Sequence, residues 1–194
     1  LVGDYVLDPV MRGVTQGNTV VARLLGYYLA EGNFGYDAKR DLPEGTPCFV
    51  EWSFNKGETE YHEEVINLIS QLGYHAVGPY FKNGAATIRC NSPELADMML
   101  RLGGKYSWGK CIADEVMHWD VASQKTLLEA YFNGDAHWKV SENGNRHFEF
   151  ATVSETLAQQ VQVLCTRCGI RCSEPGAHDY RDKEYGKDRR VYYS

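Results

Sequence analysis

The sequence predicts an α+β fold built from one unit that is repeated with pseudo-twofold symmetry. Two segments with helical spacing of apolar residues, 18–34 and 120–138, each end at an acidic residue, Glu31 or Asp135, and these acids are 104 positions apart. A strand-like stretch and a second, amphipathic helix follow each acid. The repeated unit is therefore α-β-β-α-β-β-α, which the chain contains once in full and once without its last helix.

The first helix of each repeat has clear start signals. Asn18 or Thr19 opens one helix and Asp120 opens the other, because short polar side chains accept hydrogen bonds from the free N–H groups of a first helical turn. Both helices end in a short glycine-containing segment around the acid. Small residues at Gly26 and Ala130 allow the two helix backbones to approach each other closely, so the two acids are expected to meet.

Strands and second helices continue both repeats in the same order. The second helices align at Gly73 and Gly169, which are 96 positions apart, so the first repeat contains eight extra residues. We assign these residues to the polar loop at 37–47, which carries proline and glycine. The predicted strands are 49–54 and 146–150, and the predicted second helices are 58–73 and 154–169.

A β-hairpin is predicted after each second helix. In the first repeat, Asn83-Gly84 marks a two-residue turn between strands at 74–81 and 85–90. The second hairpin spans 171–193 and has a longer, charged loop.

The remaining segments complete one domain over residues 1–194. Residues 93–102 have the apolar spacing of a third helix. We expect a first repeat at about 18–104, a linker at about 105–119 and a second repeat at about 120–194.

Composition excludes several classes of protein. Hydrophobic residues make up 43% and charged residues 24% of the 194 residues, which is typical of a folded globular chain. No window is apolar over the ~20 residues of a membrane helix, and the first residues lack a signal-peptide pattern. We therefore expect an intracellular protein, in cytoplasm or nucleoid, without membrane contact. Its six dispersed cysteines favour free thiols in a reducing compartment.

Net charge limits the type of nucleic-acid binding that the chain can perform. The net charge is −6, and the first 100 residues carry 7 basic and 13 acidic side chains, whereas the remainder carries 13 of each. Such a balance argues against indiscriminate nucleic-acid binding, so any basic surface must be local.

The acids at the two equivalent helix ends predict a cation site. A carboxylate at a helix C-terminus lies beside the negative end of the helix dipole and beside unpaired carbonyl groups, which is unfavourable by ~0.3–1 kcal/mol. A divalent cation compensates both, and an oxygen-only ligand set selects Mg²⁺ or Mn²⁺ over zinc. Two solvent-facing helix ends are the alternative, but repetition of the acid in both halves favours the cation site.

The segments around these acids carry a family resemblance. LLGYYLAEG (24–32) and LEAYFNGDA (128–136) resemble the two motifs of the LAGLIDADG homing endonucleases, particularly those embedded in inteins. KCIADEVMHWD (110–120) is similar to the family's K-x-I-P-x-x-V segment, and residues 152–170 resemble its post-strand helix. The chain departs from the family pattern at Ala113, where proline is common, and at Ala136, where glycine is usual.

This resemblance implies a monomeric, site-specific double-strand DNA endonuclease. Its β-strands would form a saddle on the major grooves, and its motif helices would form the central interface. Glu31 and Asp135 match the family's metal ligands, and the carbonyl groups of Ala30 and Gly134 are expected as further ligands of Mg²⁺ or Mn²⁺. Lys110 matches a basic-pocket residue that stabilises the charge developing on the phosphate, with an ordinary solvated lysine as the alternative.

Sequence-reading residues are expected on the strands, where alternate side chains face the DNA. The alternative for each of them is a solvated surface charge, or, for the tryptophan, a position in the core. The candidates are Trp52, Lys56, Lys82, Arg89, Lys139, Arg146, Arg181, Lys183, Arg189 and Arg190.

Two further interpretations remain open at this point. Cys165, Cys168 and Cys172, with His178 nearby, have spacings that a zinc site could use, but Cys165 and Cys168 align with the apolar Ile69 and Leu72 of the other repeat, which favours core positions. The alternative to an endonuclease is a catalytically inactive nucleic-acid-binding protein on the same scaffold, such as a maturase or a regulator. Retention of both acids favours the enzyme.

Overall fold

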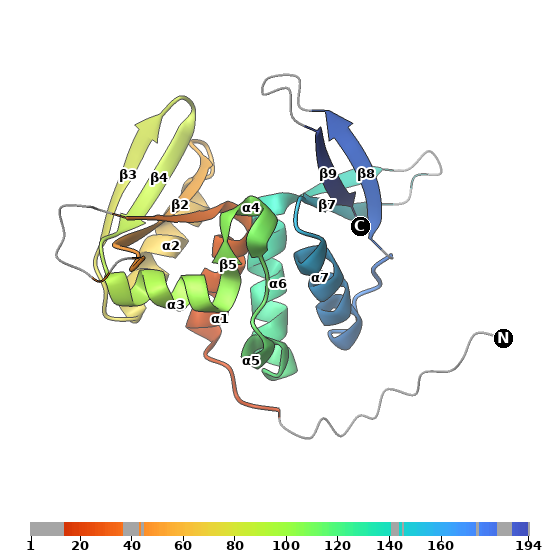
Figure 1. The fold of residues 1–194 in the computed structure, drawn as a ribbon, viewed down its shortest axis with the longest axis horizontal. Helices are drawn as coiled ribbons and strands as arrows, with labels where there is room; N and C mark the ends of the chain where they lie inside the picture. Colours follow the sequence, from red (N-terminus) through yellow and green to blue (C-terminus); the bar gives the residue numbers. More distant parts are fainter. Residues whose placement is uncertain are drawn as a thin grey trace.

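Two four-stranded sheets flank a central pair of helices in the computed structural model of the chain (Figure 1). The structure describes residues 14–36, 43, 45–140, 144, 146–173, 175–181 and 188–193. All strand pairs within the two sheets are antiparallel, and the helices pack on one side of each sheet. The predicted α+β class and its two equivalent halves are confirmed.

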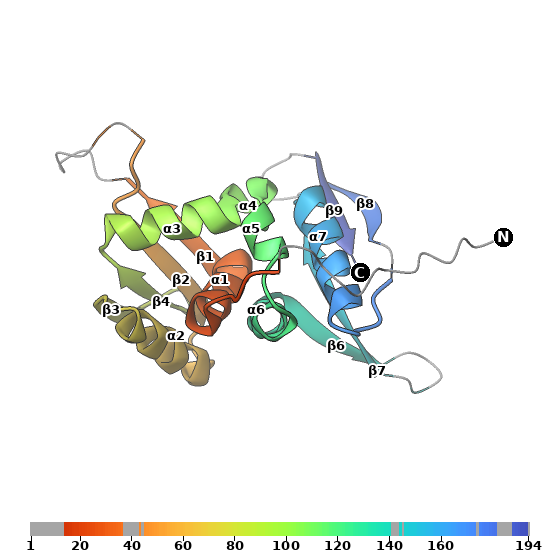
Figure 2. The same ribbon diagram turned by 90° about the horizontal axis from the view of Figure 1, so that it is seen from below.

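The central pair consists of α1 (Thr19–Glu31) and α6 (Val121–Asp135), which lie side by side and run in the same direction (Figures 1 and 2). The predicted caps form: the Asn18 side chain accepts hydrogen bonds from the first turn of α1, and the Asp120 side chain accepts one from Ser123 N–H in α6. Each helix ends at its acid. Glu31 and Asp135 therefore lie at the same end of the central helix pair.

The first sheet has the strand order β1-β2-β4-β3. Buried and partly exposed residues alternate along β2 and β4, because one face of the sheet packs on the helices and the other faces away. The predicted Asn83-Gly84 turn joins β3 to β4, and both residues have positive φ, as this turn requires. The elements are β1 (Gly32–Gly35), β2 (Phe49–Asn55), α2 (Thr59–Gln71), β3 (Ala76–Lys82), β4 (Ala85–Cys90) and α3 (Pro93–Gly103).

The second sheet repeats this order as β6-β7-β9-β8. Helix α7 takes the place that α2 has in the first half, and the Ser154 side chain caps it by accepting a hydrogen bond from Leu157 N–H. Its elements are β6 (Ala136–Val140), β7 (Arg146–Thr152), α7 (Glu155–Arg167), β8 (Gly176–Arg181) and β9 (Asp188–Tyr193).

The connection between the halves contains short elements that the sequence analysis did not resolve. These are β5 (Gly104–Lys105), α4 (Tyr106–Gly109) and α5 (Asp114–Met117). Backbone hydrogen bonds from Thr15 N–H to His118 O and from Asp120 N–H to Thr15 O tie the approach to α1 to the start of α6. The starts of the two central helices are thus fixed to each other. The domain boundaries themselves stay predictions.

One continuous core joins both halves. It contains most of α1, the second half of the inner face of α6, alternate residues of β2 and β4, and the inner faces of α2, α3 and α7. Within the described ranges, no helix combines the length and the apolar character needed to cross a bilayer.

Candidate active site

The exits of α1 and α6 bring Glu31 and Asp135 to the same place. A Cβ atom added to Gly134 would lie 3.2 Å from Glu31 Cγ, so the Glu31 side chain leans against the last turn of the opposite helix. Both acids are partly buried. The predicted meeting of the two helix ends is therefore present, and the carboxylates belong to one site rather than to two separate solvent-facing ends.

Burial raises the pKa values of both acids. Burial, with the negative charge of Asp135 adding to it, raises the pKa of Glu31 to about 7. Burial also raises the pKa of Asp135 to about 6, although the Lys110 ammonium opposes this shift. The site therefore carries negative charge that the surrounding protein compensates only in part.

Lys110 is the nearby cation, and it is buried rather than open to solvent. Its Nζ donates hydrogen bonds to the carbonyl oxygens of Tyr28 at 2.6 Å, Leu29 at 2.9 Å and Ala30 at 3.5 Å. A cation on the last carbonyls of a helix compensates both the unpaired acceptors and the dipole. Burial lowers the pKa of Lys110 to about 8, while Asp135 and Glu31 oppose the shift.

The alternative of an ordinary solvated lysine is therefore wrong, because Lys110 is buried. Its role toward a phosphate stays a prediction. The ammonium already has three acceptors at the end of α1, one of which is the Ala30 carbonyl expected as a metal ligand. Its local sequence could not predict these contacts, because each spans 80 or more residues.

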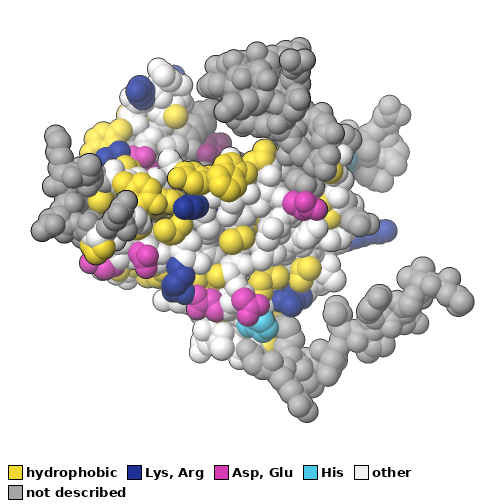
Figure 3. Space-filling view, viewed as in Figure 1, with side chains coloured by type: hydrophobic (Ala, Val, Ile, Leu, Met, Phe, Trp, Pro, Cys, Tyr) yellow, Lys and Arg dark blue, Asp and Glu magenta, His cyan; other side chains and the backbone are white. Residues whose placement is uncertain are grey.

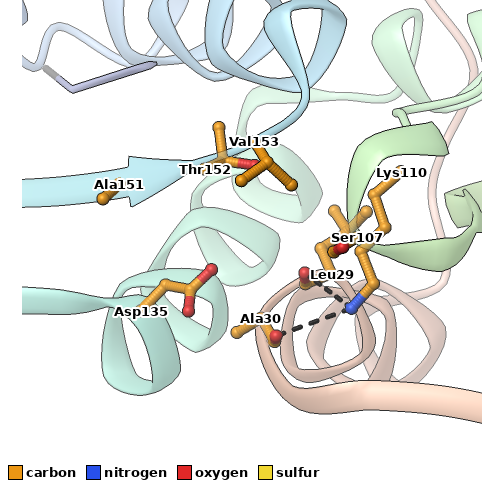
Figure 4. Close-up of a pocket in the computed structure, with 8 residues that line it drawn as sticks. All are labelled: Leu29, Ala30, Ser107, Lys110, Asp135, Ala151, Thr152 and Val153. Carbon is orange, nitrogen blue, oxygen red and sulfur yellow. Dashed lines mark hydrogen bonds between the residues drawn. The ribbon is translucent and has the colours of Figure 1, made fainter. Parts of the chain in front are cut away.

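A cavity of about 210 Å³ opens between these groups and the second sheet (Figure 4). Asp135 and Lys110 border it from opposite sides, and Ser107 of α4 lies beside Lys110. The end of β7 closes another side through Thr152 and its two neighbours. Sequence reasoning missed Ser107 and Thr152 as site residues, because only the packing of α4 and β7 brings them here. The lining residues are Leu29, Ala30, Ser107, Lys110, Asp135, Ala151, Thr152 and Val153.

Tyr131 places its hydroxyl near Asp135. Its side chain is fully buried, and Asp135 is the group with which its Oη interacts. Burial and the nearby Asp135 carboxylate raise the pKa of this hydroxyl well above its usual value. The equivalent residue of α1, Tyr27, instead donates a hydrogen bond of 2.5 Å to Glu64. The surroundings of the two equivalent tyrosines therefore differ between the halves.

The donor set at the helix exits fits a hard divalent cation. Within the described part of the chain, no three His, Cys, Asp or Glu side chains are grouped to hold a metal ion. The available donors are the carboxylates of Glu31 and Asp135 and neighbouring backbone carbonyls, all of them oxygen ligands of the kind that Mg²⁺ and Mn²⁺ prefer. The raised carboxylate pKa values show that added positive charge would be stabilising here.

Three of the predicted DNA-facing residues lie where the first sheet can present them. Lys56 and Lys82 have exposed side chains at one end of the sheet, beside the Asn83-Gly84 turn. Arg89 lies on the outer face of β4, but it forms an ion pair with Glu51 of β2, and its guanidinium lies 4.0 Å from the centre of the Phe49 ring.

Trp52 is a correction to that set. Its side chain is completely buried between sheet and helices, so it cannot contact DNA. The alternation of Val50, Trp52 and Phe54 with more polar residues was the signal for this, since period-two burial places all three on the core face.

The second sheet is described in less detail. Lys139 is exposed on β6 and forms an ion pair with Glu149 of β7, which also lies 3.2 Å from His137 Nε2. Arg146, Arg181, Arg189 and Arg190 lie on its strands, but their side chains are outside the described part of the structure. Lys183 is outside the described residues altogether.

Exposed aromatic side chains beside the cavity were also missed from sequence. Tyr106 and Trp108 of α4 are 48% and 68% exposed, and their rings stack with centres 5.3 Å apart. Figure 3 shows a band of hydrophobic side chains across the face on which α4 lies. A tryptophan within the predicted linker was a possible sequence signal for an exposed aromatic residue, but only the tertiary structure shows that α4 borders the cavity.

The cysteines with zinc-like spacing belong to the core. Cys165 and Cys168 are buried in α7 and at its end, and Cys172 packs against the same core. A hydrogen bond with Cys172, together with burial, raises the pKa of the Cys165 thiol. The core interpretation of Cys165 and Cys168 is thus confirmed, while the His178 side chain lies outside the described part of the structure.

The sequence matches one family model and several longer proteins. Residues 123–192 match the model of a LAGLIDADG-like domain. An uncharacterized protein of Methanocaldococcus jannaschii is 29% identical over 155 residues, which cover 78% of this chain and 17% of that protein. An iron-sulfur cluster assembly SufBD family protein of Mycobacterium tuberculosis is 29% identical over 183 residues, which cover 86% of this chain and 19% of that protein. The chain thus spans less than a fifth of the length of these relatives.

Solved structures show the same fold. The homing endonuclease I-DmoI, in a crystal structure with DNA and Mn, matches with a TM-score of 0.58 and 11% identity, covering 91% of this chain and 89% of that one. The N-terminal LAGLIDADG domain of DUF199/WhiA matches with a TM-score of 0.53 and 15% identity, covering 93% of this chain and 78% of that one.

Proposed function

The chain has the LAGLIDADG fold and carries a LAGLIDADG-like domain, and on this premise we propose that it is a site-specific double-strand DNA endonuclease dependent on Mg²⁺ or Mn²⁺. The observation that carries the proposal is the pairing of Glu31 and Asp135 at the ends of two equivalent, closely packed helices. Both carboxylates have raised pKa values, so their charged forms are unfavourable in the folded chain. A protein that only binds nucleic acid would not need such a pair of acids.

Glu31, Asp135 and Lys110 have different roles in the proposed reaction. Glu31 and Asp135 would hold the divalent ions, which when bound activate water and stabilise the leaving oxygen in phosphodiester hydrolysis. The Lys110 ammonium compensates the end of α1 and keeps positive charge close to both carboxylates. The cavity between Asp135, Lys110 and β7 gives a reacting phosphate access to this charge.

Double-stranded DNA is the proposed partner. Both sheets extend past the helix exits on the same side of the molecule, so a duplex lying across them would place its backbone at the acids (Figure 1). The exposed Lys56 and Lys82 and the outward-facing Arg89 and Lys139 are the described basic groups on these sheets. We propose that the protein acts as a monomer, because the chain itself supplies both acids.

The relatives support a mobile insertion. The same segment matches less than a fifth of two proteins with different names, one uncharacterized and one of the SufBD family. A module that matches a small part of longer chains is the arrangement expected of an intein-encoded homing endonuclease, which is the origin that we propose.

Cleavage of a randomised duplex library in Mg²⁺ or Mn²⁺, followed by sequencing of the ends, tests this function. We expect recurrent double-strand breaks at one long sequence, and loss of cleavage with retained binding in Glu31→Gln and in Asp135→Asn. Glu63→Gln is the matched control, since Glu63 is an exposed acid on α2. Cuts that persist in both acid variants would contradict the proposal.

A catalytically inactive nucleic-acid-binding protein, such as a maturase or regulator, is the second candidate. Lys110 favours it, because its ammonium already neutralises the end of α1, including the Ala30 carbonyl, without a metal ion. Selective retention of one sequence with no cleavage in either metal would support this candidate.

A further inference from the structure

The Lys110 side chain belongs to a short connecting segment that both halves of the molecule hold. On one side, the segment is tied to the end of α3: Cys111 N–H donates to Gly103 O at 3.1 Å, and Ala113 N–H donates to Leu102 O at 2.9 Å. On its other side, it is tied to α7 of the second half. The Lys110 side chain reaches the end of α1 in the first half, so the segment contacts both halves of the molecule.

Two side chains from the second half make the contacts on that other side. The Gln160 amide forms a pair of hydrogen bonds with the backbone of Ile112: Ile112 N–H donates to Oε1 and Nε2 donates to Ile112 O, both at 2.7 Å. Ser154 Oγ donates to the backbone carbonyl of Lys110 itself at 2.6 Å. Ile112 is 1% exposed and Ser154 is 2% exposed, so these contacts lie in an interior where an unpaired backbone group would be unfavourable.

Gln160 makes different contacts from the equivalent residue of the first half. Under the alignment of Gly73 with Gly169, Gln160 corresponds to Glu64 of α2. Glu64 binds the first central helix through Arg23, at 2.6 Å, and Tyr27. Gln160 contacts the connecting segment instead, and the Tyr131 hydroxyl, equivalent to that of Tyr27, faces Asp135 of its own helix rather than a residue of α7. The second half has therefore exchanged a contact with its own central helix for a contact with the segment that carries Lys110.

We propose that Gln160 and Ser154 are positioning residues that place the Lys110 ammonium at the end of α1, so that the second half of the chain sets the charge at the exit of the first. A glutamine is suited to this task, because a neutral amide can both accept from Ile112 N–H and donate to Ile112 O. Glutamate lacks the donor and methionine lacks both groups. The effect on cleavage rests on the proposed function, whereas the placement of Lys110 can be tested without it.

Amine labelling tests the placement directly. The rate of reductive methylation at Lys110 is measured by mass spectrometry against the exposed Lys56 and Lys82, in the native chain and in Gln160→Met. We expect Lys110 to be protected in the native chain and its labelling to rise about tenfold in the variant, because local opening of the segment frees the ammonium. Gln159→Met is the matched control, since Gln159 is the preceding glutamine on α7 and is exposed.

Thiol labelling separates positioning from general loosening. The buried Cys90 and Cys165 are expected to stay protected in Gln160→Met. If Gln160→Met does not fold, Ser154→Asp carries the test, because aspartate keeps the cap of α7 and removes the hydroxyl donor to Lys110 O. Unchanged Lys110 labelling in a folded variant, or equal exposure of the thiols, would overturn the proposal.

The cleavage readout deepens the test where the native chain cuts DNA. Gln160→Met should slow single-turnover cleavage at saturating DNA by about tenfold or more, as loss of a supporting partner typically does, with DNA affinity unchanged. In a Lys110→Met background, Gln160→Met should have little further effect. Failure of the native chain to cut DNA would count against the proposed function alone, because the labelling result stands by itself.

Discussion

Gly134 and Ala30 contact each other across the central helix pair, so closely that a Cβ atom on Gly134 would lie 2.5 Å from Ala30 Cβ. The pseudo-equivalent contact joins Gly26 to Ala130, where the corresponding distance would be 2.7 Å. In each contact, one glycine leaves room for one alanine, and the two contacts lie one helical turn apart. This reciprocal exchange of small residues allows the two carboxylates to converge.

Exchanging the members of one contact tests whether close packing or residue identity matters. Gly134→Ala should lower the free energy of unfolding by about 1–3 kcal/mol, because the new Cβ collides with Ala30 and forces the helices apart. The double variant Gly134→Ala with Ala30→Gly should recover most of that loss, since one methyl group is again present at the contact. Urea unfolding of the native chain, both single variants and the double variant measures this.

Gly57→Ala provides the reference for adding a methyl group elsewhere. A Cβ on Gly57 would meet only Asn55 Oδ1, at 3.6 Å, which is an ordinary contact. Additive effects of the two single changes, with no recovery in the double variant, would show that this contact does not determine the spacing of α1 and α6.

Glu51 pairs with Arg89 on the outward face of the first sheet, so under the proposed function this ion pair would limit the affinity of the sheet for DNA. Glu51→Gln should tighten DNA binding by about two- to fivefold, since the ion pair no longer competes with phosphate for the guanidinium. The salt dependence of binding should steepen by about 0.9 in log–log slope if Arg89 gains one phosphate contact. Fluorescence anisotropy over a range of salt concentrations measures both.

Glu63→Gln changes the net charge by the same amount at an exposed position on α2. An equal gain in affinity in Glu63→Gln would show that the effect comes from total charge rather than from release of Arg89.

Asp120 should make stability depend on pH in the acid range. Its carboxylate accepts hydrogen bonds from Gly17 N–H, Ser123 N–H and Ser123 Oγ, which lower its pKa from 3.8 to about 2. A group whose pKa is lower in the folded chain stabilises it above its unfolded pKa, and this contribution is lost as the pH falls. Native stability relative to Asp120→Asn should therefore be constant above about pH 5 and should decrease between pH 4 and pH 2.

Urea midpoints at several pH values measure this difference. Asp97→Asn, which removes an exposed aspartate from α3, should show no comparable pH-dependent difference from the native chain. A constant gap between the native chain and Asp120→Asn down to pH 2 would contradict the assignment.

Most helices and the first hairpin could be predicted because their signals are local. Asn18 and Asp120 cap their helices through bonds within one turn, and Asn83-Gly84 forms its turn from two residues alone. Strands β1 and β6 were not singled out, since Gly32–Gly35 has little intrinsic strand preference and becomes a strand by pairing with β2.

The sequence by itself determined the repeated order of elements, the two acids at equivalent helix ends and the small residues that let those ends meet. Local propensity, periodicity and internal repetition contain that information. Only the tertiary structure decided that Lys110 covers the carbonyls at the end of α1, and that Gln160 holds the segment carrying it. These depend on contacts between residues tens of positions apart, whose geometry is set when sheets and helices pack together.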